Sequence, residues 1–179
     1  MSPIAHCGTA LLGWQLASRR KNVFTLGLFL VAANLPDLDF LLRFLPGPGP
    51  APLHQAFTHN LPFVLVTIGL LSLLLPPGRD RWGLVLVGLS HLILDVIVID
   101  LVPPVGIRAL YPFSDRLFNF GFFPYVQRGS FKAMATIRNL GVFALEAAVF
   151  VLPVVLAFPR RLGRELGSRE FWSVRGNAA

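Results

Sequence analysis

The chain has 179 residues, of which 54% are hydrophobic and only 14% are charged, whereas about a quarter of the residues in soluble domains are charged. This composition excludes an ordinary water-soluble globular domain and is typical of a membrane protein. The single cysteine excludes an intramolecular disulfide framework and a thiolate metal cluster. No recognised nucleic-acid-binding pattern accompanies the net charge of +7, so we expect no nucleic-acid partner.

Uncharged apolar runs predict an all-α protein, an integral membrane helical bundle of about five helices that forms a single domain over residues 1–179. The expected helices are residues 4–18, 23–36, 61–76, 82–102 and 139–159. A helix needs about 20 residues to cross the hydrocarbon core, so we expect the first two to be tilted or partly interfacial. A Pro/Gly-rich connector at 45–52 and a longer connection at 103–138 interrupt the helices.

Basic residues are unevenly distributed among the connections. Most of them follow the first helix, precede the fourth or follow the fifth, and these are Arg19, Arg20, Lys21, Arg79, Arg81, Arg160, Arg161, Arg164, Arg169 and Arg175. Five spans would place these three groups on one side, which the positive-inside rule makes cytoplasmic. All four histidines and most carboxylates then belong to the opposite half, so we expect a polar site on the outer side.

The fourth predicted helix carries a pair of residues that could bind a metal ion. His91 and Asp95 lie four residues apart, on one helical face and within reach of one ion. An unpaired carboxylate in the bilayer would cost several kcal/mol, so Asp95 needs a partner. The alternative to a metal site is a hydrogen bond between His91 and Asp95 that braces helix packing.

Two carboxylates follow the end of the second predicted helix. Asp37 and Asp39 are two residues apart, so an extended backbone would direct both the same way. Zn²⁺, Mn²⁺ and Mg²⁺ accept such oxygen ligands. A solvated helix end or turn is the alternative.

Two histidines precede the third predicted helix. His54 and His59 are five residues apart, about 140° on a regular helix, so at least one must come from non-helical backbone. Thr58 and Pro62 predict a helix start near residues 59–62, which leaves His59 on a loop. Two interfacial histidines without a ligand are the alternative.

The first histidine is informative only together with the others. His6 alone would more often be an interfacial residue than a ligand. Four histidines and at least three aspartates on one side of a bundle are difficult to attribute to chance, since each costs energy to bury. Together they could supply ligands for one or two adjacent divalent metal ions.

These motifs resemble those of the YdjM-type membrane-bound metal-dependent hydrolase family. The matching segments are Pro3 through His6, Leu35 through Asp39, His54 through Asn60, Ser90 through Asp95, and Gly106 through Ser114. The resemblance implies a bacterial inner-membrane protein, distantly similar to zinc-dependent phospholipase C. It also implies a metal-ligand set, which comprises His6, Asp37, Asp39, His54, His59, His91 and Asp95.

Two positions depart from the family pattern. Gln55 stands where we expect an arginine, and Asn60 stands where we expect a serine. The missing arginine leaves phosphate recognition to another basic residue. Candidates are Arg43, Arg108 and Arg116.

The function expected from the sequence is hydrolysis, dependent on Zn²⁺ or another divalent ion, of a membrane lipid or a lipid-linked phosphoester at the extracytoplasmic face. Asp39 or Asp115 is the candidate general base, and we expect residues 112–115 to form a turn over the site. Glu146 could act as a base, orient a metal ligand, or pair with Arg138 or another arginine of the outer side, and we expect the pairing. The alternatives are a metal ion transporter or a metal-stabilised membrane scaffold without hydrolytic activity.

Overall fold

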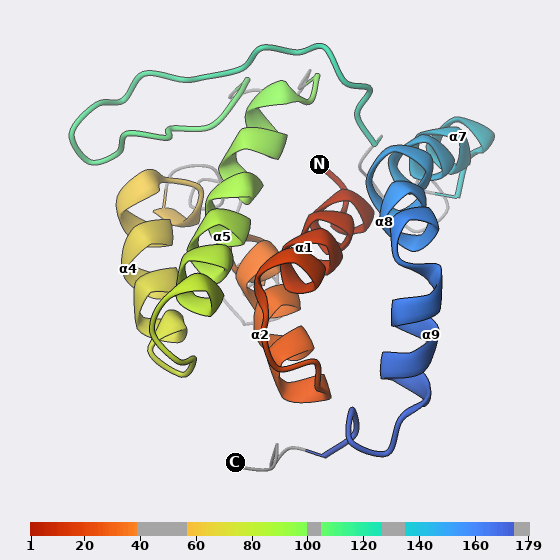
Figure 1. The fold of residues 1–179 in the computed structure, drawn as a ribbon. Coiled ribbons are helices and arrows are strands. Elements are labelled where there is room, and N and C mark those ends of the chain that lie inside the picture. Colours follow the sequence, from red (N-terminus) through yellow and green to blue (C-terminus); the bar gives the residue numbers. More distant parts are fainter. Residues whose placement is uncertain (39–56, 100–104, 127–134, 174–179) are drawn as a thin grey trace, which may run out of the picture.

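The computed structural model describes residues 1–38, 57–99, 105–126 and 135–173. These residues form helices joined by turns and loops, and they contain no β-strand. The helices are α1 (Pro3–Ala17), α2 (Val23–Asn34), α4 (Leu61–Ser72), α5 (Arg79–Ile97), α7 (Ile137–Glu146), the π-helix η3 (Ala147–Val151), α8 (Leu152–Ala157) and α9 (Pro159–Gly167). Figure 1 shows α1 between α2 and α5 on one side and the α7–α8 segment on the other.

The helical fold class predicted from the sequence is confirmed for the described residues, but five membrane spans are not. Among these residues one helix is long and apolar enough to cross a membrane, Ile137–Ala157, with 21 residues and only 17% of its apolar window buried. Val23–Leu38 and Leu61–Ser72 are apolar but shorter. The predicted regular helix at 139–159 consists of α7, the π-helix and α8, and α9 was not predicted.

Polar side chains fix where the helices begin. Ser2 accepts a hydrogen bond from the Ile4 amide (3.2 Å) at the start of α1, and Asn60 accepts one from the Phe63 amide (2.8 Å) at the start of α4. These bonds satisfy amides that lack a partner within the first turn of a helix. Each cap therefore also fixes the position of the histidine closest to it, His6 or His59.

Small residues allow α1 to approach its neighbours closely. A Cβ atom at Gly13 would lie 2.2 Å from Val87 of α5, and one at Gly8 would lie 2.6 Å from the Phe150 carbonyl oxygen of the π-helix. Small residues permit such backbone contacts between helices in membranes. Helix α1 is thus held on both sides in the position that carries His6.

The loop of residues 105–126 covers the end of the bundle where α5 ends and α4 begins (Figure 1). The amide of Phe120 donates to the Val96 carbonyl (2.7 Å), and the amide of Phe122 donates to the Ile97 carbonyl (3.0 Å). The Leu61 amide donates to the Ala109 carbonyl (2.8 Å). The loop therefore satisfies backbone groups at two helix ends, next to Asp95 and His59.

At the other end of the bundle, the basic residues that follow α1, begin α5 and lie in α9 are close together, since Lys21 interacts with both Arg79 and Arg161. The Arg19 amide donates to Asp80 in the first turn of α5 (2.8 Å), and Gln15 of α1 donates to Glu165 of α9 (2.8 Å). Asp80 and Asp95 are fifteen residues apart on α5, so these two ends lie about 22 Å apart along the helix.

Candidate metal centre

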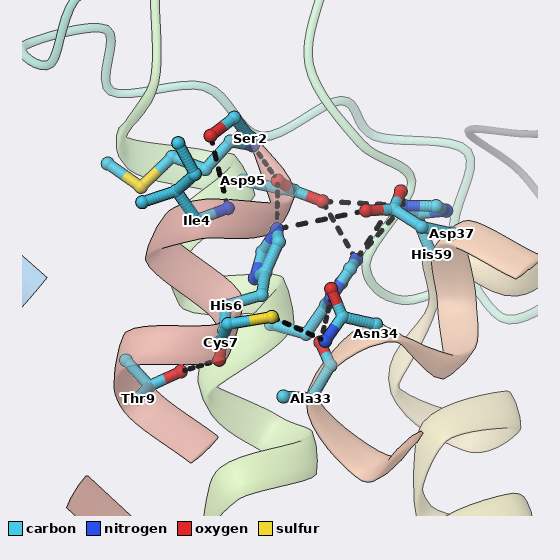
Figure 2. A network of polar contacts seen from close by, with 12 residues as sticks. Ser2, Ile4, His6, Cys7, Thr9, Ala33, Asn34, Asp37, His59 and Asp95 are labelled. Atoms are coloured by element: carbon cyan, nitrogen blue, oxygen red, sulfur yellow. Dashed lines mark hydrogen bonds and ion pairs between the residues drawn. The ribbon is translucent and has the colours of Figure 1, made fainter. Parts of the chain in front are cut away.

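Four helix ends bring histidine and aspartate side chains together at one end of the bundle (Figure 2). His6 lies in the first turns of α1, and Asp37 lies in a turn of 3-10 helix that follows α2. His59 lies two residues before α4, while His91 and Asp95 lie in the last turns of α5. Because α1 starts, α2 ends, α4 starts and α5 ends here, residues far apart in sequence meet.

Four of these side chains offer ligand atoms within 4.8 Å of one another, namely Asp37, His59, His91 and Asp95. The Nε2 atom of His59 lies 3.2 Å from Asp37 Oδ1 and 3.3 Å from Asp95 Oδ2. The Nε2 atom of His91 lies 3.1 Å from Asp95 Oδ2 and 3.2 Å from His59 Nε2. We call these four residues the metal centre.

The spacing of these atoms fits a bound cation. Ligand atoms around a tetrahedral zinc ion, with bonds of about 2.0–2.2 Å, are about 3.3–3.6 Å apart. Four pairs in the metal centre are 3.1–3.3 Å apart, and His91 Nε2 lies 3.9 Å from Asp37 Oδ1. Two imidazoles and two carboxylates are ligands that divalent transition metals accept, so the residues present fit a metal ion.

Neighbouring groups orient both imidazoles of the metal centre. The Nδ1 atom of His91 lies 2.7 Å from the Ala33 carbonyl oxygen, and that of His59 lies 2.9 Å from the Thr58 hydroxyl. A carbonyl accepts only, so Nδ1 of His91 carries a hydrogen, and the neutral form of this ring has its lone pair on Nε2. Such contacts fix the tautomer and ring orientation of metal-binding histidines.

The metal centre is largely closed to solvent, but its carboxylates are not fully covered. His59 is 2% and His91 0% exposed, whereas the side chains of Asp37 and Asp95 are 20% and 11% exposed. Burial lowers the pKa of His59, but the nearby carboxylates Asp37 and Asp95 outweigh burial and raise this pKa to about 9. The carboxylates thus create a negative potential that attracts a proton or a metal cation.

His6 lies beside the metal centre. Its ring stacks on that of His91 with the ring centroids 4.1 Å apart. Its Nε2 atom lies 3.6 Å from Asp95 Oδ1 and 3.9 Å from Asp37 Oδ2. The side chain is fully buried, and neither ring nitrogen has a hydrogen-bond partner.

Among the described residues, Glu146 pairs with a serine and with no arginine, unlike the pairing that the sequence predicted. It is fully buried at the end of α7 and accepts hydrogen bonds from the Ser2 amide (3.2 Å) and the Ser2 hydroxyl. Ser2 caps α1, so Glu146 anchors the helix that carries His6. Its partner lies 144 residues away in sequence, which no local pattern reveals.

Further residues were predicted for the site from the sequence. Asp39, His54 and Arg43 fall outside the described residues. Asp115 lies on the loop that covers the site end, where its side chain is 81% exposed and 3.8 Å from Arg108. The turn predicted at residues 112–115 lies earlier, at 109–113, where the Phe113 amide donates to the Leu110 carbonyl (2.9 Å). Asp115 follows this turn and is not among the four convergent side chains.

Sequence reasoning missed Thr58 and the Ala33 carbonyl, the two groups that orient the imidazoles. A hydroxyl residue directly before a predicted histidine ligand was a usable signal for Thr58. Ala33 gives no signal, since any residue carries a backbone carbonyl.

A family model described as YdjM inner membrane protein matches residues 1–162. No curated protein and no solved structure matches the chain.

Proposed function

The chain belongs to the YdjM family of inner membrane proteins, and from this premise we propose that it is a membrane-bound metal-dependent hydrolase that acts on a lipid or lipid-linked phosphoester. The proposal has two parts. The metal centre binds a divalent cation, and substrate reaches that cation from the membrane surface.

The observation that carries the proposal is the convergence of Asp37, His59, His91 and Asp95, with both imidazoles oriented by other groups. Nitrogen and carboxylate oxygen ligands suit Zn²⁺, and catalytic zinc sites combine histidines with a carboxylate. We propose Zn²⁺ as the ion, with Mn²⁺ and Mg²⁺ as alternatives. A divalent cation in such a site lowers the pKa of a water molecule and polarises a phosphoryl oxygen.

The side chains of the centre have distinct roles in this proposal. His59 and His91 bind through Nε2, and their oriented Nδ1 atoms limit reorganisation on binding. Asp37 and Asp95 neutralise the positive charge and, being partly exposed, border the side open to substrate. Asp39 and Asp115 remain candidates for the general base that accepts a proton from water.

The loop over the site end supports a lipid substrate. Phe113, Phe120 and Phe122 are 86%, 71% and 68% exposed, and aromatic side chains are enriched where proteins meet the membrane interface. Arg108 and Arg116 lie on the same loop and supply positive charge for a phosphate group. An apolar loop with two arginines beside the site suits a phosphate head group attached to an acyl chain.

The charge distribution gives the proposed orientation. Basic residues gather at the end opposite the metal centre, where Trp82 and Trp172 are 69% and 64% exposed. The positive-inside rule assigns the basic end to the cytoplasm. The metal centre would then face the periplasm or cell exterior.

The test uses the full chain in lipid nanodiscs, loaded with Zn²⁺ and freed of excess metal. We expect bound zinc and hydrolysis of phospholipid in added vesicles, both lost in His91→Ala while the protein remains inserted and helical. Bound zinc without hydrolysis of any lipid phosphoester would contradict the enzyme and favour a scaffold. Zinc uptake into sealed proteoliposomes without hydrolysis would favour a transporter.

A further inference from the structure

His6 is a buried imidazole that is not one of the four residues of the metal centre. Its exposed fraction is 0%, and both ring nitrogens lack a hydrogen-bond partner. A buried polar group without a partner costs about 1–3 kcal/mol. Its Nε2 atom points at the two carboxylates Asp95 and Asp37, 3.6 and 3.9 Å away, so the position calls for a ligand between them.

The stacking of His6 on His91 excludes a shared ion. The two ring planes are only 16° from parallel, and the ring centroids are 4.1 Å apart. The lone pair of an imidazole nitrogen lies in the plane of its ring, so a bound ion lies in that plane as well. Two nearly parallel planes have no common point near the rings, so His6 and His91 cannot bind the same ion well.

The two carboxylates divide their oxygens between the stacked rings. In Asp95, Oδ2 faces His91 (3.1 Å) while Oδ1 faces His6 (3.6 Å). In Asp37, Oδ1 lies 3.9 Å from His91, while Oδ2 lies 3.9 Å from His6. Each aspartate therefore presents one oxygen to the metal centre and the other to His6, as a bridging carboxylate does.

We propose that the site holds two divalent cations bridged by Asp37 and Asp95. The first lies in the metal centre, and the second lies between His6 Nε2, Asp37 Oδ2 and Asp95 Oδ1. The 4.1 Å separation of the rings agrees with the spacing of about 3.5–4 Å between ions in two-metal enzymes. The amino group of Met1 donates to Asp95 Oδ1, so the second cation would take the place of that positive charge.

The second cation narrows the proposed function, on which it rests. Two-cation sites at this spacing serve phosphatases and nucleases, where the ions stabilise both the attacking and the leaving oxygen. Aminopeptidases also have two-cation sites of this spacing, and Arg108 and Arg116 on the loop at the site end favour a phosphoester over a peptide.

The test counts metal ions without measuring activity. The full chain in nanodiscs is loaded with Mn²⁺, freed of excess metal, and analysed for metal content and by electron paramagnetic resonance. We expect two ions per wild-type chain with an exchange-coupled spectrum. The variant His6→Phe keeps an aromatic ring against His91, and we expect it to hold one ion with an uncoupled spectrum.

The matched control is Gln15→Ala, which alters another buried polar residue of α1 (1% exposed) at the opposite end of the helix. This variant should retain two coupled ions. One ion in the wild type, or two in His6→Phe, would overturn the second cation and leave the metal centre intact. No bound ion in the wild type would instead contradict the proposed function itself.

Discussion

The two ends of the bundle treat buried carboxylates differently. At the basic end, Asp80 is 1% exposed and is neutralised by Arg19, whose guanidinium lies 3.7 Å away. At the site end, Asp37 and Asp95 face imidazoles, and among the described residues no lysine or arginine side chain contacts either of them. The amino group of Met1 lies against Asp95, and so does the imidazole of His59, whose pKa of about 9 lets it carry a positive charge.

This difference shows where each end obtains its positive charge. A buried carboxylate requires a positive partner or a change of protonation. At the basic end, the positive partner is a side chain of the protein, Arg19. At the site end, two carboxylates and two imidazoles converge on one point, where a metal ion could bind. We infer that the site end takes its cation from solution, so the same substitution should act on stability at one end and on metal binding at the other.

The largest effects are expected in the metal centre, where Asp95→Asn is compared with Asp80→Asn on the same helix. Asp95→Asn removes a negative charge from the metal centre, so we expect zinc affinity to fall by about 100-fold or more. His91→Ala should be more severe, since it removes the ligand atom. Competition with a zinc-sensitive dye measures the affinity. Equal zinc affinities in the two asparagine variants would contradict the distinction between the ends.

A smaller loss of affinity is expected from Thr58→Val. The valine cannot form a hydrogen bond with Nδ1 of His59, which the Thr58 hydroxyl approaches at 2.9 Å. Removing a group that orients a metal ligand costs about 10- to 100-fold in affinity. The matched control is Thr67→Val, because Thr67 makes its closest hydrogen bond to the Phe63 carbonyl within α4 (2.6 Å). A zinc affinity that Thr58→Val leaves unchanged would mean that the ring orientation of His59 is fixed by other contacts.

Much of the site was predictable because its signals are local. The spacing of His91 and Asp95 places both on one face of a helix, and Thr58 with Pro62 indicates that His59 precedes one. The arrangement of these segments is not local. His91 and the Ala33 carbonyl are 58 residues apart, and only packing of α5 against α2 brings them into contact.

The division between His6 and the metal centre was also beyond the sequence. His6 was predicted as one ligand among seven, whereas its stacking on His91 depends on the crossing of α1 and α5. The π-helix at Ala147–Val151 was not predicted either, and it lies against α1 at Gly8. The apolar run that contains Ala147–Val151 predicts a regular helix. One extra residue per turn leaves no mark in a uniformly apolar sequence.

A still smaller effect, on stability, is expected from Asp80→Asn. The buried carboxylate accepts a hydrogen bond from the Arg19 amide (2.8 Å), and bonds to charged groups are stronger than neutral ones. The amide of asparagine can replace the bond but not the charge, so we expect the free energy of unfolding to fall by about 1 kcal/mol. Denaturant unfolding in detergent, monitored by circular dichroism, measures it. Unchanged unfolding would mean that Arg19 gives Asp80 no net stabilisation.

The smallest effect concerns Lys21, at the basic end outside the helices. Burial, together with the nearby Arg161, lowers its pKa from 10.5 to about 8, so between these values the unfolded chain binds more protons than the folded one. The free energy of unfolding should therefore rise with pH from about 8 to 10.5. Below pH 8 the cost of burying the charged Lys21 no longer changes with pH. Because Lys21 is partly exposed, solvent screening reduces the rise to a few tenths of a kcal/mol.

Replacing this lysine tests that rise. Lys21→Met removes the titrating group, so the difference in unfolding free energy between wild type and variant should change with pH only between about 8 and 10.5. The same pH series on Asp80→Asn should keep the rise, since its Lys21 is intact. A pH-independent difference between wild type and Lys21→Met would mean that crowding of like charges at the basic end is relieved by solvent, and that this end tolerates its positive charge without cost.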